Sequence, residues 1–426
     1  MELLVFIVSL FVLLTFGIPI ALVLVLSATA LMFFMDQWNP VIISQSMVQG
    51  ANSFTLMAVP FFMLAGEIMA KGGLSRLLVQ FASILVGRIN GGIGYTAVLA
   101  SILFAGLSGS AVADAAALGA ILIPIMKSRG YDIGRSTGLV TASSLIAVII
   151  PPSIPLILLG SMVGISISRL FMAGIVPGLL IGLALMVTWF LVAKKDGYED
   201  KEIFTAKEAW QITKKSLPAL FMPILIIGGI RFGIFTPTEA GVFATVYAFL
   251  VSIFIYKELK MKDMGEIFVK AAQSTAVVML VVAAASAVAW LITIAQLPVQ
   301  VASLLGGFMD SPMLLLMVII IFLFLVGMVM DMTPAILIFA PILFPVIIQA
   351  GIDPYFFGII MVFNLAIGLI TPPVGTLLYL GSSIGNISFG QMLKGIMPFL
   401  IAEILMMLLY AFVPELITTP MKWFTE

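Results

Sequence analysis

The chain has 426 residues, of which 62% are hydrophobic and 9% are charged, and its formal net charge is zero. A soluble core cannot bury so much apolar surface, and apolar runs of about 20 residues, long enough to cross a bilayer, recur along the chain. The composition therefore predicts an all-α polytopic membrane protein and gives no indication of nucleic-acid binding. The absence of cysteine excludes disulfides and thiol nucleophiles, and the absence of histidine removes the usual catalytic base.

Residues 1–35 are expected to form the first scaffold helices. Glu2 stands where a signal peptide carries basic residues, and the apolar run is too long for such a peptide, so we expect the segment to remain. Residues 194–216 form a polar run with six lysines. Because lysine and arginine mark the cytoplasmic side, this run is expected to be a cytoplasmic linker. Residues 217–256 would form further scaffold helices, and counting spans from the linker places both termini in the periplasm.

The sequence contains an internal repeat, with a first copy at residues 36–193 and a second copy at 257–426. The Pro-Pro pair at 372–373 lies 221 residues after the pair at 151–152, and further prolines match in the same register. Basic residues border the central part of the first copy, whereas residues 291–358 contain neither lysine nor arginine. This contrast predicts copies of opposite orientation, as in inverted-repeat transporters.

Each copy is expected to contain a re-entrant helical hairpin followed by a helix that is broken at Pro-Pro. The hairpins would span about residues 89–127 and 310–349, with polar tips at Ser108–Ser110 and Gly327–Thr333, and the broken helices would span about 131–165 and 353–385. Proline lacks an N–H and frees the carbonyl four residues earlier. One such pair could be a simple kink, but two at symmetric positions favour an oxygen-rich site for a hard cation such as sodium.

Two acidic residues lie near the predicted tips. Asp331 lies at the second tip, where the first copy has Ser110, and Asp114 follows the first tip. Intramembrane acids are usually functional, and each of these could complete an ion site, carry a proton or cap a helix. Glu67 and Glu403 carry less weight, because a lysine follows Glu67 closely and Glu403 is expected near an interface or a partner.

An enzyme is not expected. The motif Gly106-Leu107-Ser108-Gly109 has the G-x-S-G pattern of intramembrane serine proteases, but that chemistry needs a base to activate the serine, and the chain has no histidine. Asp114 and Asp331 could meet like the aspartates of an aspartyl protease, but no G-x-G-D motif occurs. A channel or a scaffold protein would not explain the inverted repeat with its paired broken helices.

Three stretches resemble a known family. The runs GLSGSAVADAAALGAILIPIMKSRGYD, VIIPPSIPLILLG and GLITPPVGTLLYLG resemble the large, DctM-like membrane subunit of tripartite ATP-independent periplasmic (TRAP) transporters. The resemblance covers essentially the whole chain. It implies a sodium-driven, elevator-type symporter of the bacterial inner membrane for acidic organic solutes such as sialic acid or C4-dicarboxylates. Its expected partners are a small four-helix membrane subunit and a periplasmic substrate-binding protein.

The resemblance also implies two or more sodium ions and no organic cofactor. Carried onto this chain, one sodium site would involve Gly106, Ser108, Ser110, Ala147 and Ser153, and the other Gly327, Asp331, Thr333, Gly368 and Thr371. The substrate would lie between the tips, within reach of Ser144, Asn364 or Thr376. The alternatives are a stand-alone sodium/dicarboxylate symporter that needs no binding protein and, less favoured, a cation/proton antiporter.

Overall fold

The structure, a computed structural model, describes residues 1–425, which form helices joined by short turns. In chain order the elements are α1 (Glu2–Thr15), α2 (Ile20–Phe34), α3 (Pro40–Ala51), η1 (Thr55–Met57), α4 (Ala58–Lys71), α5 (Leu74–Val86), α6 (Gly92–Ser108), α7 (Ala111–Ser128), α8 (Ile133–Ser143), η2 (Ser144–Val148), α9 (Ile154–Val163), α10 (Ile167–Asp196) and α11 (Ala206–Arg231). They continue as α12 (Pro237–Leu250), η3 (Val251–Ile255), η4 (Met261–Asp263), α13 (Met264–Ile294), α14 (Leu297–Leu304), α15 (Gly306–Met309), α16 (Pro312–Val329), α17 (Met332–Gln349), α18 (Pro354–Gly368), α19 (Thr376–Gly385), α20 (Phe389–Phe412) and α21 (Glu415–Thr425).

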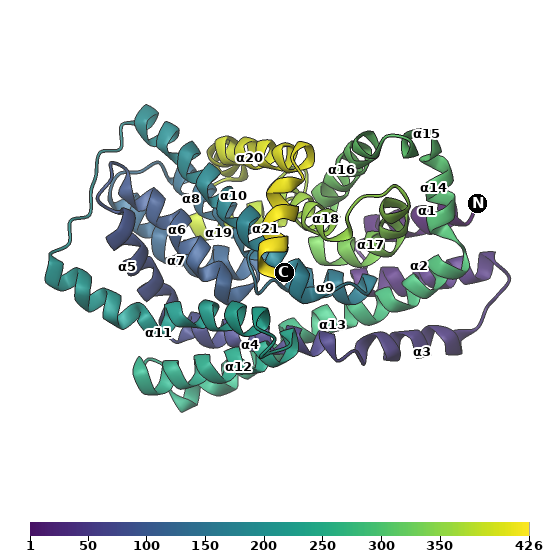
Figure 1. Ribbon diagram of the computed structural model, residues 1–426, viewed down its shortest axis with the longest axis horizontal. Coiled ribbons are helices and arrows are strands. Elements are labelled where there is room, and N and C mark those ends of the chain that lie inside the picture. The colour runs from purple at the N-terminus through teal and green to yellow at the C-terminus, as the bar shows by residue number, and fades with distance from the viewer. Residues whose placement is uncertain (426) are drawn as a thin grey trace.

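The prediction of an all-helical, multi-span membrane protein is confirmed. Within residues 1–425, eight helices are long and apolar enough to cross a membrane, and a ninth span results if the bent pair Pro40–Ala51 and Thr55–Lys71 is counted as one. The two members of that pair lie end to end along one side of the molecule and are bent by 57° (Figure 1). α13 packs against α2, α3 and α4, and α12 packs against α4. The first and second halves of the chain are therefore interleaved.

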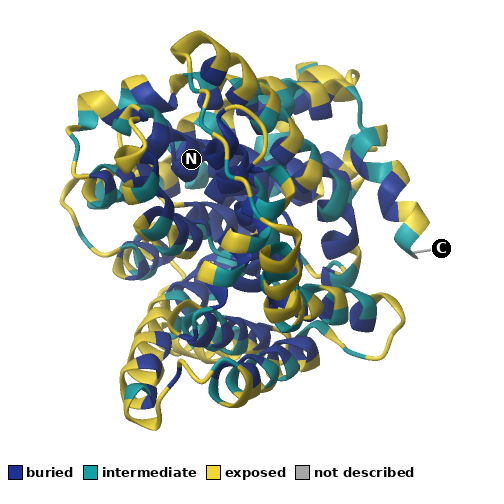
Figure 2. Cartoon of the chain, turned by 90° about the vertical axis from the view of Figure 1, so that its left-hand side faces the viewer, coloured by how far each residue is buried: buried dark blue, intermediate teal, exposed yellow. Residues whose placement is uncertain are grey.

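Buried residues gather inside the helical assembly, and exposed residues lie on its outer faces (Figure 2). The outer faces of α11 and α12 expose large apolar side chains, among them Phe221, Ile224 and Val246. Water does not solvate such a surface well, so it suits contact with lipid or with another membrane subunit.

The polar run at residues 194–216 is helical at both ends and non-helical in the middle. α10 continues through the first lysines to Asp196, because positive charge is favoured in the last turn of a helix. α11 begins at Ala206, where Thr205 and Glu208 form a capping box that satisfies two backbone N–H groups. Residues 197–205 are thus the non-helical connection between the halves.

Each copy contains a pair of packed helices joined at a sharp break, α6 with α7 and α16 with α17. At the first break Gly109 has φ +62°, a left-handed conformation that favours glycine, and the Ser110 hydroxyl caps α7 by accepting a hydrogen bond from Ala113 N at 3.4 Å. At the second break Asp331 caps α17 by accepting a hydrogen bond from Thr333 N at 3.3 Å. Short polar residues and glycine therefore explain why the chain turns at these two places.

The helices that follow the Pro-Pro pairs are exchanged between the copies. α8 leads through η2 to α9, which packs against α17 and α18 of the second copy. α18 leads to α19, which packs against α7 and α8 of the first copy. Figure 1 shows α19 among α6 to α8 on the left and α9 near α17 and α18 on the right. Each copy thus completes the core of the other.

α8 and α20 cross in close contact at glycines. A Cβ atom added to Gly395 would lie 2.0 Å from the Gly134 carbonyl oxygen, and one added to Gly138 would lie 2.7 Å from the Gly395 carbonyl carbon. The crossing therefore leaves no room for a side chain, and it fixes the start of the first broken helix against the second copy.

We expect Gly395→Ala to destabilise the protein by about 1–3 kcal/mol, because the added methyl group forces two backbones apart. Thermal unfolding of the purified protein in detergent would measure this effect. Gly390→Ala is the matched control on the same helix, since a Cβ atom there would meet nothing within 4 Å. Equal melting temperatures for the two variants would contradict the tight crossing.

Candidate ion and substrate sites

The first hairpin tip touches the first Pro-Pro break. The Gly109 carbonyl accepts a hydrogen bond from Ile154 N at 3.3 Å, and a Cβ atom on Gly109 would lie 2.4 Å from the Pro152 carbonyl oxygen. η2, which precedes the break, packs against both arms of the hairpin. The tip and the break thus form one unit, although more than 40 residues separate them in the chain.

Hydroxyl and carboxylate oxygens gather at the first tip. Ser108 is buried; its hydroxyl donates a hydrogen bond to Asp114 Oδ1 and accepts one from Ser110 N at 3.3 Å. Asp114 is fully buried, and its other oxygen, Oδ2, has no hydrogen-bond partner within residues 1–425. A buried carboxylate oxygen without a partner is costly. Ser110 caps α7, so capping does not explain the position of Asp114.

The break itself is built from backbone oxygens and one serine. Residues 144–148 form a 3₁₀ turn, and the peptide bond between the two prolines is cis. The Ser153 hydroxyl donates a hydrogen bond to the Val148 carbonyl at 2.6 Å and accepts one from Leu156 N at 3.3 Å, which caps α9. Ala147 and Gly106, which are predicted to contribute carbonyls, are also buried, and a Cβ atom on Gly106 would lie 3.8 Å from the Pro151 carbonyl.

The second tip and the second break meet in the same way. A Cβ atom added to Gly368 would lie 2.4 Å from the Gly327 carbonyl carbon, and Val374 N donates a hydrogen bond to the Met328 carbonyl at 3.2 Å. The Thr371 hydroxyl donates to the Ile367 carbonyl at 2.7 Å.

Asp331 and Thr333 lie at the start of α17, where Asp331 is exposed and Thr333 is partly exposed. Of the residues predicted for the second sodium site, Gly327 and Gly368 are in direct contact, while Asp331 is joined to Thr333 by the capping hydrogen bond. No group of three or more acidic, histidine or cysteine side chains that could hold a metal ion occurs within residues 1–425.

The three residues predicted to contact substrate lie in different surroundings. The Ser144 hydroxyl donates to the Thr141 carbonyl and the Asn364 amide to the Ile320 carbonyl, each at 2.7 Å, and both side chains are buried. Thr376 is exposed at the start of α19. No hydrogen bond joins these three side chains in the part of the chain that the structure describes.

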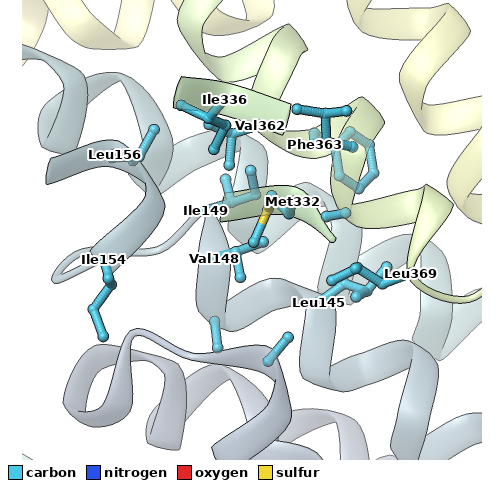
Figure 3. Close-up of a cluster of buried hydrophobic side chains, with 14 of the residues drawn as sticks. Leu145, Val148, Ile149, Ile154, Leu156, Met332, Ile336, Val362, Phe363 and Leu369 are labelled. Atoms are coloured by element: carbon cyan, nitrogen blue, oxygen red, sulfur yellow. The ribbon is translucent and has the colours of Figure 1, made fainter. Parts of the chain in front are cut away.

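The space between the two breaks is filled by apolar side chains (Figure 3). Val148 and Ile149 of the first copy lie beside Met332 of the second, with Ile336 and Leu369 close by. All of these side chains are buried. Apolar side chains of both copies therefore meet in the core between the two tip–break units (Figure 3).

From the sequence, Glu403 is expected near an interface or a partner. In the structure it lies inside the molecule. Glu403 is 1% exposed, and neither carboxylate oxygen has a hydrogen-bond partner within residues 1–425. The signal was present in the sequence: Phe399, Met407 and Tyr410 lie at helical spacing from Glu403 and form the buried face of α20.

The chain matches known transporters over nearly its whole length. Residues 7–416 match the family described as the DctM component of the tripartite ATP-independent periplasmic transporter. The chain is 46% identical to YiaN of Escherichia coli, the large permease of a 2,3-diketo-L-gulonate TRAP transporter, over 96% of both chains. It is 36% identical to the large permease DctM of a C4-dicarboxylate TRAP transporter of Pseudomonas aeruginosa, over 93% of this chain and 92% of that one.

Two further matches bear on length and on fold. The sialic acid TRAP transporter permease SiaT of Haemophilus influenzae is 38% identical over 94% of this chain, but the match covers only 65% of SiaT. The YdaH transporter of Alcanivorax borkumensis, a solved structure, has a TM-score of 0.61 at 14% identity and covers 89% of this chain and 88% of that one. The chain therefore belongs to the DctM family of TRAP transporters and is a large permease subunit, not an enzyme.

Proposed function

We propose that the chain carries out sodium-coupled uptake of an acidic organic solute that a periplasmic binding protein delivers. The observation that carries this proposal is the pair of tip–break units, each of which presents backbone carbonyls and hydroxyls at an interrupted helix. Such oxygens suit a hard monovalent cation, and discontinuous helices of secondary transporters use their unwound backbone in this way.

One sodium ion would bind in each unit. In the first unit the ligands would come from Gly106, Ser108, Ser110, Ala147 and Ser153, and in the second from Gly327, Asp331, Thr333, Gly368 and Thr371. The contacts of Gly109 with Ile154 and of Gly327 with Gly368 support this grouping, since each joins a tip to the break of the same copy.

We further propose an elevator mechanism built on inverted repeats. The reciprocal packing of α9 on α17 and of α19 on α7 is what two copies of opposite orientation would produce. Both hairpins and both broken helices would move together as the transport domain. Residues 1–35 and 217–256 would belong to the scaffold, and residues 194–216 would lie in the cytoplasm with both termini in the periplasm of a bacterial inner membrane.

The substrate class follows from the relatives. The names of those relatives give 2,3-diketo-L-gulonate, sialic acid and C4-dicarboxylates, which are all organic acids. Ser144, Asn364 and Thr376 would contact the solute between the tips after a rearrangement that separates the apolar side chains now packed there (Figure 3). An anion cannot accumulate unaided against a negative-inside potential, and each co-transported sodium ion adds about 2.3 kcal/mol per 100 mV. Two sodium ions therefore suffice for a monoanion.

The partners would be a periplasmic binding protein and a small four-helix membrane subunit. About a third of SiaT lies outside the match to this chain, which leaves room for a second membrane subunit in that polypeptide. The exposed apolar faces of α11 and α12 would accept such a subunit here.

Uptake of labelled sialic acid and succinate into proteoliposomes tests the proposal. With an inward sodium gradient, the small subunit and the binding protein, we expect uptake of one solute that stops when choline replaces sodium or when either partner is omitted. Sodium-driven uptake by this chain alone would instead establish a stand-alone symporter. Sodium-independent uptake would contradict the proposed coupling.

We expect Asp331→Asn to lower sodium-driven uptake at least tenfold at limiting sodium, because it removes the negative charge at the second tip. The folded protein should remain stable, since asparagine also caps helices well. Asp353→Asn is the matched control, because Asp353 caps α18 by accepting a hydrogen bond from Phe356 N at 2.8 Å and lies at no tip. Wild-type sodium dependence in Asp331→Asn would refute the role of this carboxylate.

A further inference from the structure

A cavity of about 360 Å³ separates the first hairpin tip from α4 and α13. Ser108 and Ser110 line it on the side of the hairpin, and Glu67 of α4 and Ser274 of α13 line it on the opposite side. Much of the remaining wall is apolar, including Met63, Phe104 and Val112. The cavity thus combines four oxygen-bearing side chains with a surface that water solvates poorly.

Glu67 is the one charged residue in this lining, and it makes no hydrogen bond or ion pair within residues 1–425. Lys71 lies one helical turn after Glu67 on α4, and Lys270 lies one helical turn before Ser274 on α13. Both of them pair with Glu266 instead: Lys71 with Oε2, and Lys270 with Oε1 at 2.9 Å. Neither lysine therefore forms an ion pair with Glu67, although Lys270 lies near enough for its charge to interact with that of Glu67.

We propose that this cavity is a cation-binding vestibule, in which Glu67, Ser274, Ser108 and Ser110 hold a sodium ion before it enters the first tip–break unit, where the same Ser108 and Ser110 are proposed ligands. Carboxylate and hydroxyl oxygens are the donors that hard cations prefer, and the apolar wall strengthens the attraction of the ion to the carboxylate. A cleft lined by one sign of charge also raises the local concentration of counter-ions.

The two walls of the vestibule belong to different parts of the molecule. Ser108 and Ser110 lie on the hairpin, which would move in an elevator mechanism, whereas Glu67 and Ser274 lie on helices that pack with α12 and with α2 and α3. An ion that contacts both walls stabilises this arrangement, because displacement of the hairpin would separate its ligands. Glu67 thus binds a cation beside the first tip, before the cation reaches the first tip–break unit. This inference rests on the proposed sodium coupling.

Sodium-dependent thermal stability of the purified chain tests this inference without a solute. The melting temperature would be followed as NaCl replaces choline chloride at constant ionic strength. We expect Glu67→Gln to raise the NaCl concentration for half-maximal stabilisation about tenfold. The substitution deletes one unit of negative charge that lies several ångströms from the ion and so weakens the binding of the ion. Glu67→Asp, which keeps the charge, should restore most of the wild-type response. Glu199→Gln is the matched control, because it makes the same charge change on an exposed connection outside the cavity.

Cysteine accessibility gives a second readout, because the chain has no cysteine of its own. Val112 lines the cavity and is 49% exposed, so Val112→Cys should react with a maleimide reagent. We expect sodium to slow this reaction several-fold when Glu67 is present and to have no effect in the Glu67→Gln background. Val48→Cys on α3, outside the cavity, should react at the same rate with either salt.

The outcomes separate this inference from the proposed function. Sodium stabilisation and protection that Glu67→Gln leaves unchanged would overturn the vestibule and leave the sodium coupling intact. Wild-type protein that sodium neither stabilises nor protects would overturn both. If Glu67→Gln fails to fold, Ser274→Ala removes a ligand from the same wall and should raise the half-maximal NaCl concentration two- to threefold; an unchanged value would count against the site.

Discussion

The need to satisfy every backbone N–H and C=O group where water is absent is the constraint on which this structure depends. Each copy interrupts its helices twice and so leaves backbone groups without helical partners. At the first break the Gly109 carbonyl accepts from Ile154 N, and at the second the Met328 carbonyl accepts from Val374 N. The tip of each hairpin thus provides the partner that the neighbouring break lacks, and the two interruptions of a copy are tolerated only together.

The same constraint explains the apolar centre. Because the tip and the break of a copy satisfy each other, the apolar side chains of Ile149, Met332 and Leu369 can pack between the two breaks (Figure 3). Because α9 packs against α17 of the second copy and α19 packs against α7 of the first, the two units belong to one core. A movement that displaces one unit must therefore displace the other.

Features determined by neighbouring residues could be predicted from the sequence, whereas those that depend on distant segments could not. Glycine, serine and proline mark the breaks at Ser108–Ser110 and at the two Pro-Pro pairs, because their backbone preferences act locally. The repeat register indicates which segments correspond, but not that α19 packs against α7. Ser144 and Asn364 looked available for a ligand, yet distant or neighbouring carbonyls already accept from them.

The two copies share their backbone but not their ionisable groups, so their units are not chemically equivalent. Where the first copy has Ser110 and Gly182, the second has Asp331 and Glu403, each 221 residues later. Gly182 packs so closely that a Cβ atom would lie 2.5 Å from the Ile102 side chain, so the first copy has little room for an acidic side chain at this position. Unit charges a few ångströms from an ion change its binding by 1 kcal/mol or more. The repeat therefore provides two similar backbone arrangements, and the carboxylates of Asp331 and Glu403 distinguish the second from the first.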